Sequence, residues 1–392
     1  MELQRSGDLP LYLQLRMSLE QRILNGEWGY GAMLPAEHEL CAEYGVSRGT
    51  LRQALAELER EGFVRREQGR GTFVAKAVQR EPGSGLSSRS ISFIVPYVRD
   101  SFVPTLLLGV ESAARAHGYI VLFHHVENDL EKQTAALRSA VQQGVAGIIL
   151  FPVDSTHVSP IMSELIAQSY PFVVVDRYLR GLYNDYVTSD NFGGGLRATQ
   201  HLLRLGHRRI AFVSWHDPAV TMEHRRMGYR CALEEAGLPV DPTLECEVEG
   251  YPSIDLDALA DFLSREPRPT AVFAANDQLA LAVRRAAHTL GLTVPQDLAL
   301  VGFDDLDIAA HLDVPLTTIA QPIFEMGKTA AEVVIRKIQG QSPGIERHIL
   351  PTRLIVRHSC GAYLRDQLTA DIPERRNWSR AGQVISAPWP SR

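Results

Sequence analysis

The stretch LPAEHELCAEYGVSRGTLRQALAELEREGFVRREQGRGTFV, residues 34–74, predicts two short helices followed by a hairpin. The second helix is expected from Ser47 to Glu61, because the Ser47 hydroxyl can accept a hydrogen bond from a backbone N–H of the first turn. Apolar residues recur along one face of this helix at intervals of three and four: Leu51, Ala54, Leu55 and Leu58. Residues 36–44 predict a shorter preceding helix, and Gly45 supplies the turn. Two helices joined by a short glycine-containing turn indicate a helix-turn-helix.

The polar residues of the second helix indicate a surface that reads DNA. Arg48 and Arg52 are four residues apart and are therefore neighbours on one face, with Thr50 in the same half of the helix. The first half of a recognition helix is the part that contacts base edges. Residues 63–74 place strand formers on both sides of a glycine-rich turn, which predicts a basic hairpin, or wing. The alternative is a solvated, salt-bridged helix with a basic loop, but the cap, periodicity, turn and wing together favour DNA binding.

Residues 10–74 resemble the winged helix-turn-helix of the GntR family of bacterial repressors. The resemblance is carried by PLYLQL, LPAEHEL, GVSRGTLRQAL, LEREGFV and GRGTFV. It implies DNA contacts at seven positions: Ser47, Arg48, Thr50, Arg52, Gln68, Gly69 and Arg70. His38 departs from the family pattern, which often has Arg at this position, so the contact expected from that Arg does not carry over.

Length and charge limit the class of protein. The chain has 392 residues, which suits two or more domains, and 45% of them are hydrophobic, so a sizeable core can form. The formal net charge of −6 disfavours a general nucleic-acid binder. The positive charge of the first domain is concentrated on the recognition helix and wing, which predicts sequence-selective binding.

The cysteines and the N-terminal residues bear on the cellular compartment. Four cysteines lie far apart without metal-ligand spacing: Cys41, Cys231, Cys246 and Cys360. They predict reduced thiols, with no disulfide framework and no bound metal. The start of the chain, MELQRSGDLPLYLQL, contains no apolar signal core, and no segment is long enough to span a membrane. We therefore expect a cytoplasmic protein that does not bind membranes.

Changes in composition predict the domain boundaries. With a first helix over residues 11–25, the DNA-binding domain is expected at 1–75. Residues 76–89 are rich in Pro, Gly and Ser, which predicts a flexible linker. A large effector domain is expected at 90–362, and the polar, aperiodic residues 363–392 predict a disordered tail.

The effector domain alternates between Val- and Ile-rich strands, such as ISFIVPYV and FVVVDR, and amphipathic helices. Such repeats predict an α/β fold in which parallel sheets are covered by helices on both faces. The pattern starts again near Gly195, so we expect two successive doubly wound sheets in two lobes with a cleft between them. In open sheets of this kind, ligands bind outside the carboxyl ends of the strands.

Polar side chains occur at those strand ends. Asp176, Asn276 and Asp304 each end a predicted strand, and Arg225 lies at the start of a helix. Carboxylate, amide and guanidinium groups pair well with the hydroxyls of a polyol. Aromatic walls can be supplied by Tyr97, Phe102 and Trp215. The sequence therefore predicts a small, sugar-like effector.

Residues 90–362 also resemble the effector domain of the LacI/GalR repressors, which is similar to periplasmic sugar-binding proteins. The resemblance is carried by PFVVVDR, VTSDNFGGG, HLLRLGHRRIAFV, RRMGYRCAL, FAANDQLALAV, LALVGFDD and PLTTIAQP. It implies effector contacts at Asp176, Arg225, Asn276, Asp304 and Gln321, and a weaker match extends to Phe102 and Trp215.

Other polar residues near these positions have simpler explanations. Asp277 is expected to cap the helix that follows it, and Asp305 is expected to be structural. Asp190 and Asn191 read as a helix N-cap, with Gly193 to Gly195 packing close to a sheet. The alternative is a phosphate cradle, but three glycines without a following P-loop Lys are a weak signal. The scattered histidines show no metal spacing.

Together, a GntR-type reader and a LacI-type sensor resemble the arabinose-repressor type of regulator. We expect a homodimeric, DNA-binding repressor whose affinity for double-stranded operator DNA is controlled by the effector. The alternative is the solute-binding protein of a sugar transporter, which shares the second domain but needs a signal peptide. A third alternative is a sugar-metabolising enzyme, but no GxSxG, Walker A or zinc-ligand motif occurs. The sequence therefore predicts no catalytic residue, no metal and no cofactor.

Overall fold

The computed structural model describes residues 10–24, 28, 32–60, 63–67, 70–75, 89–216, 219–249, 254–342 and 344–364. The predicted linker lies outside these residues up to position 88, as do the predicted tail from position 365 and the wing residues Gln68 and Gly69. Chain contacts divide the molecule into two compact units, and the N-terminal reader has a separate core within the first unit. Each part is therefore described by itself.

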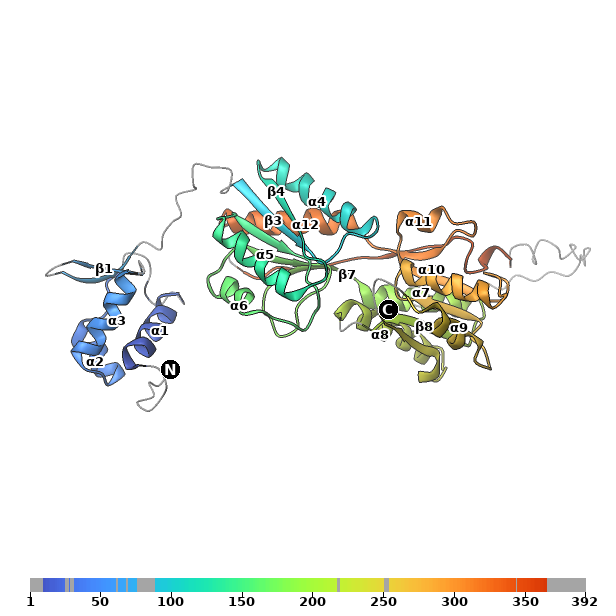
Figure 1. The fold of residues 1–392 in the computed structure, drawn as a ribbon, viewed down its shortest axis with the longest axis horizontal. Coiled ribbons are helices and arrows are strands. Elements are labelled where there is room, and N and C mark those ends of the chain that lie inside the picture. Colours follow the sequence, from blue (N-terminus) through green and yellow to red (C-terminus); the bar gives the residue numbers. More distant parts are fainter. Residues whose placement is uncertain are drawn as a thin grey trace, which may run out of the picture. The chain divides into compact units, whose positions relative to one another are not determined.

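The reader is a winged helix-turn-helix (Figure 1). Its elements are α1 (Leu11–Leu24), α2 (Glu37–Tyr44), α3 (Arg48–Arg60), β1 (Val64–Glu67) and β2 (Gly71–Val74). Gly45 adopts φ 62°, a left-handed conformation that ends α2 and that glycine accepts without a side-chain clash. The strands β1 and β2 pair antiparallel, and Leu34 N–H donates to the Thr72 carbonyl at 2.8 Å, so the chain before α2 extends this hairpin. Leucines from α1, α2 and α3 form the core, as the periodicity predicts.

The first unit contains a parallel sheet with strand order β13-β7-β6-β5-β3-β4. The strands are β3 (Ser90–Val95), β4 (Ile120–His125), β5 (Gly147–Leu150), β6 (Phe172–Val175), β7 (Asp185–Ser189) and β13 (Arg347–Leu350). The helices are α4 (Phe102–Ala116), α5 (Leu130–Gln142), α6 (Pro160–Ala167) and α12 (Ile323–Ile338). In Figure 1, α4 and α12 cover one face of the sheet, and α5 and α6 cover the other. Every residue of β3, β5 and β6 is buried, which explains their continuous apolar runs.

The second unit contains a sheet with strand order β14-β12-β11-β10-β8-β9, in which β14 alone is antiparallel to its neighbour. The strands are β8 (Ile210–Trp215), β9 (Glu245–Val248), β10 (Ala271–Ala274), β11 (Ala299–Asp304), β12 (Thr317–Ala320) and β14 (Arg353–Ile355). The helices are α7 (Asn191–Arg204), α8 (Val220–Glu235), α9 (Leu256–Ser264), α10 (Asp277–Thr289) and α11 (Asp307–Ala310), with a 3-10 turn, η2 (Pro242–Leu244). The first two residues of α8 belong to the first unit.

The predicted fold class is confirmed: two parallel-dominated, doubly wound sheets follow a small winged helix-turn-helix. One feature of the connectivity differs from the expected succession. Residues 322–351, with α12 and β13, return to the first unit, and the chain then re-enters the second unit at Thr352. In the part of the chain that the structure describes, no helix combines the length and apolarity needed to cross a membrane.

Candidate functional site

Ser47 and Thr50 stabilise the start of the recognition helix α3. The Ser47 hydroxyl accepts from the Thr50 N–H at 3.1 Å and lies 2.9 Å from the Thr50 hydroxyl, which confirms the predicted cap. Arg48, the first residue of α3, is exposed. The first turn therefore presents a guanidinium to solvent beside two hydroxyl groups.

Arginines of the recognition helix and wing are exposed, and two of them are held by surface carboxylates. The Arg52 side chain is 64% exposed, and its Nε lies 3.0 Å from a carboxylate oxygen of Glu37 on α2. Arg70 of the wing pairs with Glu67 at 2.6 Å. Arg66 donates to the Arg52 carbonyl at 2.9 Å and so fastens the wing to the recognition helix. Exposed pairs of this kind stabilise proteins by at most about 1 kcal/mol, so these arginines can exchange carboxylates for phosphates or bases at low cost.

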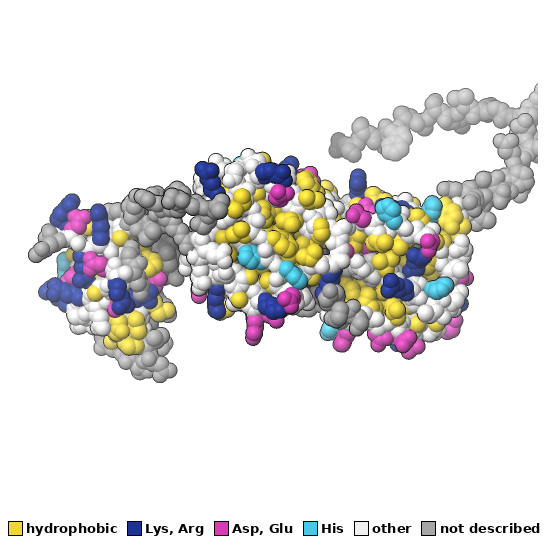
Figure 2. Space-filling model, turned by 45° about the horizontal axis from the view of Figure 1, so that its top comes forward, with side chains coloured by type: hydrophobic (Ala, Val, Ile, Leu, Met, Phe, Trp, Pro, Cys, Tyr) yellow, Lys and Arg dark blue, Asp and Glu magenta, His cyan; other side chains and the backbone are white. Residues whose placement is uncertain are grey.

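Three arginines of the reader share one hollow. A hollow of about 770 Å³ lies between the start of α2, the recognition helix and the wing, and Arg52, Arg66 and Arg70 line it. Figure 2 shows Lys and Arg side chains interspersed with Asp and Glu on the visible face of this N-terminal part. The mixed charge agrees with selective contacts rather than general attraction to phosphate.

In the first unit, Asp176 and Phe102 belong to one buried polar and aromatic cluster. Asp176 follows β6, is 5% exposed and has φ 69°. The neighbouring Arg177 donates to the Val153 carbonyl at 2.9 Å, and its guanidinium lies 5.1 Å from the centre of the Phe151 ring. The Phe151 ring in turn contacts Phe102, with ring centres 6.1 Å apart. The structure therefore links two residues that the sequence analysis assigned to the effector.

In the second unit, Arg225 is the centre of a buried polar cluster. It is 2% exposed and donates to the side-chain oxygen of Asn191 at 2.8 Å and to the Ala275 carbonyl at 2.6 Å. Its Nη1 lies 3.5 Å from Asp304 Oδ1, which also accepts from Gln321 Nε2 at 2.7 Å. The structure therefore brings together three of the predicted effector residues: Arg225, Asp304 and Gln321.

An aromatic ring borders this cluster. The Arg225 guanidinium carbon lies 3.7 Å from the centre of the Phe303 ring. The contact with the ring face and the hydrogen bonds from Nε and Nη1 together fix the orientation of the guanidinium. Among the described residues, no hydrogen bond or ring contact links Trp215 to the cluster. Phe303 is therefore an aromatic wall that the sequence analysis did not name, and the role of Trp215 stays a prediction.

The helix cap of α10 is provided by Asn276 and not, as expected, by Asp277. Asn276 Oδ1 accepts from the Leu279 N–H at 2.8 Å, whereas the Asp277 carboxylate points elsewhere and is completely buried. Asn276 also directly follows Ala275, whose carbonyl binds Arg225. Its place beside the cluster agrees with its predicted role, but its oxygen is used by the helix.

Glycines bring α7 close to the cluster. A Cβ on Gly195 would lie 2.3 Å from the Arg225 carbonyl, and a Cβ on Gly194 would lie 2.6 Å from the Phe303 ring. Larger side chains at these two positions would separate α7 from α8 and β11. This supports the packing role that the sequence analysis favoured over a phosphate cradle.

Three residues that complete these clusters lie outside the predicted effector contacts: Asn191, Phe303 and Phe151. Their position in the chain could have indicated two of them, since Phe303 directly precedes the predicted effector residue Asp304 and Phe151 directly follows β5. Asn191 was expected to cap a helix, and its side chain instead accepts from Arg225.

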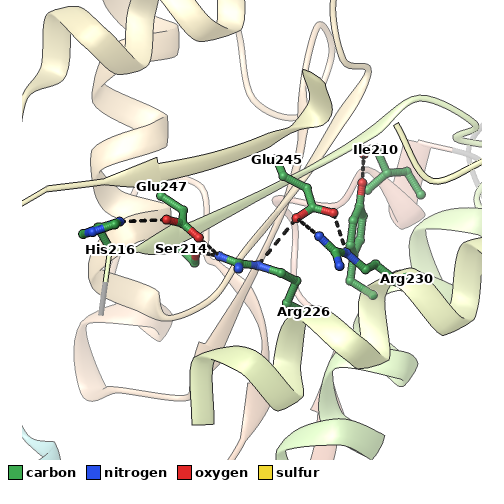
Figure 3. Close-up of polar contacts among 8 residues, drawn as sticks. Ile210, Ser214, His216, Arg226, Arg230, Glu245 and Glu247 are labelled. Carbon is green, nitrogen blue, oxygen red and sulfur yellow. Dashed lines mark hydrogen bonds and ion pairs between the residues drawn. The ribbon is translucent and has the colours of Figure 1, made fainter. Parts of the chain in front are cut away.

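The next arginine of α8 belongs to a different surface network (Figure 3). Arg226 donates to the Ser214 hydroxyl at 2.9 Å and pairs with Glu247 of β9. Arg230 binds both carboxylate oxygens of Glu245 at 2.7 and 2.8 Å. Hydrogen bonding to Glu247 raises the pKa of the exposed His216. Consecutive arginines on one helix therefore serve a buried cluster and a surface network.

In the described ranges, no group of His, Cys, Asp or Glu side chains is arranged to hold a metal ion. Residues 11–74 match the family model for bacterial regulatory proteins of the gntR family, and residues 199–360 match that for a periplasmic binding protein-like domain. The chain belongs to the family of transcriptional regulators that join a GntR-type winged helix-turn-helix to a LacI/GalR-type effector domain. By family it is a DNA-binding regulator and not an enzyme.

The relatives define this family further. The chain is 34% identical to the arabinose metabolism transcriptional repressor of Geobacillus stearothermophilus over 360 residues, which cover 90% of this chain and 98% of the relative. A solved complex of the transcriptional regulator CelR with cellobiose has 28% identity and a TM-score of 0.64, and covers 83% of this chain and 100% of CelR. A LacI-family regulator from Enterococcus faecium with bound ribose has 31% identity and a TM-score of 0.61, and covers 69% of this chain and 98% of that one.

Proposed function

We propose that this regulator represses transcription from a specific operator, and that a small sugar controls its operator affinity by binding at the clusters around Arg225 and Asp176. The observation that carries the proposal is the buried Arg225–Asp304–Gln321 cluster. Its carboxylate oxygens accept hydrogen bonds, and its guanidinium and amide groups donate them, all beside the face of Phe303. A neutral polyol matches this set, because each hydroxyl both donates and accepts.

The charge balance favours a neutral ligand. Asp304 faces Arg225 in the second unit, and Asp176 lies beside Arg177 in the first, with 3.6 Å between Arg177 Nε and Asp176 Oδ2. An anionic ligand would meet two buried carboxylates, and a cationic ligand would meet two buried guanidinium groups. The relatives support a sugar, since one is named for arabinose metabolism and two solved structures contain cellobiose or ribose. L-Arabinose is therefore the first ligand to test.

The expectation that one effector contacts both clusters remains a prediction, and it supplies the mechanism of control. A ligand can shift a conformational equilibrium only by its difference in affinity for the two states. A sugar that needs Asp176 and Arg225 together favours the arrangement in which both reach it. Typical coupling free energies of about 1–3 kcal/mol correspond to a roughly 5- to 150-fold change in operator affinity.

On the DNA side, we propose that Arg52 contacts a base edge. We propose that Ser47, Arg48, Thr50 and Arg70 contact the phosphates and bases beside it. Gln68 and Gly69 are predicted contacts of the wing and lie outside the described residues. One recognition helix covers too few base pairs for genomic specificity, so we propose a cytoplasmic homodimer on a two-fold symmetric operator. Light scattering of the protein with and without operator DNA tests the dimer, and a monomeric complex contradicts it.

The effector proposal is tested by thermal unfolding of the full chain with L-arabinose, D-ribose or cellobiose. A sugar that binds only the folded state raises the melting temperature by an amount that grows with its concentration. We expect one of the three to do so, with D-arabinose as the matched control for L-arabinose. If none of the three raises the melting temperature at millimolar concentration, the sugar proposal is wrong.

A further inference from the structure

Asp277 is a completely buried carboxylate that the proposed function does not use. It is the first residue of α10, but Asn276 supplies the cap of that helix. One Asp277 oxygen accepts from the Leu306 N–H at 2.8 Å, and the other accepts from the Thr318 hydroxyl at 2.6 Å. The side chain therefore ties the start of α10 to the segment after β11 and to β12.

The segment that Asp277 holds is a strained turn. Asp304 and Asp305 have φ values of 116° and 60°, so two consecutive residues with side chains occupy the left-handed region that favours glycine. Such conformations cost free energy and persist only where surrounding contacts enforce them. Leu306, whose N–H binds Asp277, is the residue directly after this turn.

A second contact holds the turn from the other side. Asp305 pairs with Arg357 at 2.7 Å, and Arg357 also donates to the Leu316 carbonyl at 2.9 Å. This places Asp305 in a structural role, as its position after the strand suggests. The Asp304 side chain is then left to bind Gln321 and Arg225.

The space for the Asp277 carboxylate depends on a glycine. A Cβ on Gly302 would lie 2.2 Å from Asp277 Oδ1, so even alanine at this position would collide with the carboxylate. Burial raises the pKa of Asp277 to about 7, so the ionised form is unfavourable at this position. Burying a carboxyl group costs free energy unless hydrogen bonds compensate for the lost contact with water. We therefore expect the two hydrogen bonds of Asp277 to stabilise the local structure.

We propose that Asp277 is a positioning residue for the effector site. It holds the Asp304–Asp305 turn in its strained conformation, and the turn directs the Asp304 carboxylate to Gln321, Arg225 and the sugar. The inference rests on the proposed function, and it adds a determinant of effector affinity that does not itself touch the ligand.

The test is calorimetric titration of the full chain with L-arabinose, or with D-ribose or cellobiose if only that sugar stabilises the wild type. Asp277→Ala is expected to raise the Kd at least tenfold, while operator affinity without sugar stays within twofold of wild type. Asp277→Asn is expected within threefold of wild type, because its amide oxygen can accept from Leu306 and its NH₂ can donate to Thr318. Asp255→Ala is the matched control, since Asp255 caps α9 in the same unit by accepting from the Ala258 N–H at 2.9 Å.

Thr318→Val provides a second route if Asp277→Ala does not fold. It keeps the volume of Thr318, removes the hydroxyl that binds Asp277, and is expected to weaken sugar binding about threefold. Wild-type sugar affinity in Asp277→Ala, or in Thr318→Val where the first variant does not fold, overturns the inference. So does an equal loss in Asp277→Ala and Asp277→Asn. A wild-type protein that binds none of the three sugars contradicts the proposed function itself, and the inference fails with it.

Discussion

The reader and the second unit use the same kinds of side chain in opposite ways. The Arg52 side chain in the reader is 64% exposed and is held by Glu37, whereas the Arg225 side chain is 3% exposed and is held by an amide, a carbonyl, a carboxylate and an aromatic ring. An exposed arginine with one weak partner can move to a phosphate or a base. A buried arginine with four partners is already oriented, so a ligand loses little free energy in ordering it. The difference suggests that the reader adapts to a long polyanion and that the sensor selects a small ligand by shape.

The comparison predicts a large difference in stability between two neighbouring substitutions on α8. Arg225→Met leaves Asp304 buried without its cationic partner, so we expect a loss of about 3–5 kcal/mol in the free energy of unfolding. Arg226→Met breaks pairs with Glu247 and Glu245, whose side chains are 39% and 11% exposed, so we expect a smaller loss of about 1 kcal/mol. Urea denaturation of both variants measures these values, and equal losses would contradict the distinction between buried and surface arginines.

The second prediction concerns the exposed reader. Arg52→Ala is expected to remove roughly 1–3 kcal/mol of discrimination at one base position in each half-site, because an arginine that binds guanine through two hydrogen bonds specifies that base. Arg60→Ala is the matched control, since Arg60 lies on the same helix and pairs with Glu57 in its last turn. The measurement is the affinity for a panel of operators with single base changes. Uniform weakening across the panel would show that Arg52 contacts phosphate only.

A smaller effect is expected from the titration of Asp277. Burial raises its pKa to about 7 in the folded protein, although the hydrogen bonds from Thr318 and Leu306 act in the opposite direction. The folded state therefore binds a proton more tightly than the unfolded state, and stability falls as pH rises toward and through the folded pKa. The asparagine of Asp277→Asn does not titrate, so only the wild type loses this stability. The free energy of unfolding of the variant, relative to that of the wild type, should therefore increase by on the order of 1 kcal/mol between pH 6 and pH 8.

Urea denaturation of wild type, Asp277→Asn and the surface control Asp255→Asn at three pH values measures whether this difference in the free energy of unfolding increases with pH. A difference between wild type and Asp277→Asn that does not change with pH would mean that Asp277 does not titrate in this window.

The parts of the fold that depend on local pattern could be predicted from the sequence. The Ser47 cap, the apolar face of α3 and the buried strands β3, β5 and β6 follow from spacing over a few residues. The return of α12 and β13 to the first unit could not be predicted, because it depends on which sheet edge accepts a strand distant in sequence.

The candidate site shows the same limit. Strand-end position predicted Asp304, a helix start predicted Arg225, and Gln321 came only from the family resemblance; the structure brings the three together. Strand-end position could not decide between Asn276 and Asp277 as the helix cap, because either side chain can accept from a free N–H and only backbone conformation selects one. Nor could it show that the Phe303 ring lies against Arg225, since that depends on the packing of α8 on β11.

The central claim is that the buried cluster around Arg225 controls the exposed reader. The most direct measurement is the operator affinity of the full chain across a titration with the sugar that stabilises it, for wild type, Arg225→Met and Arg226→Met. Gln321→Met, which leaves Arg225 in place, is the second cluster variant if Arg225→Met is too unstable. We expect wild type and Arg226→Met to change operator affinity at least fivefold with sugar, and the cluster variant to bind the operator normally without sugar and not to respond. A cluster variant that responds to sugar like wild type would contradict the account.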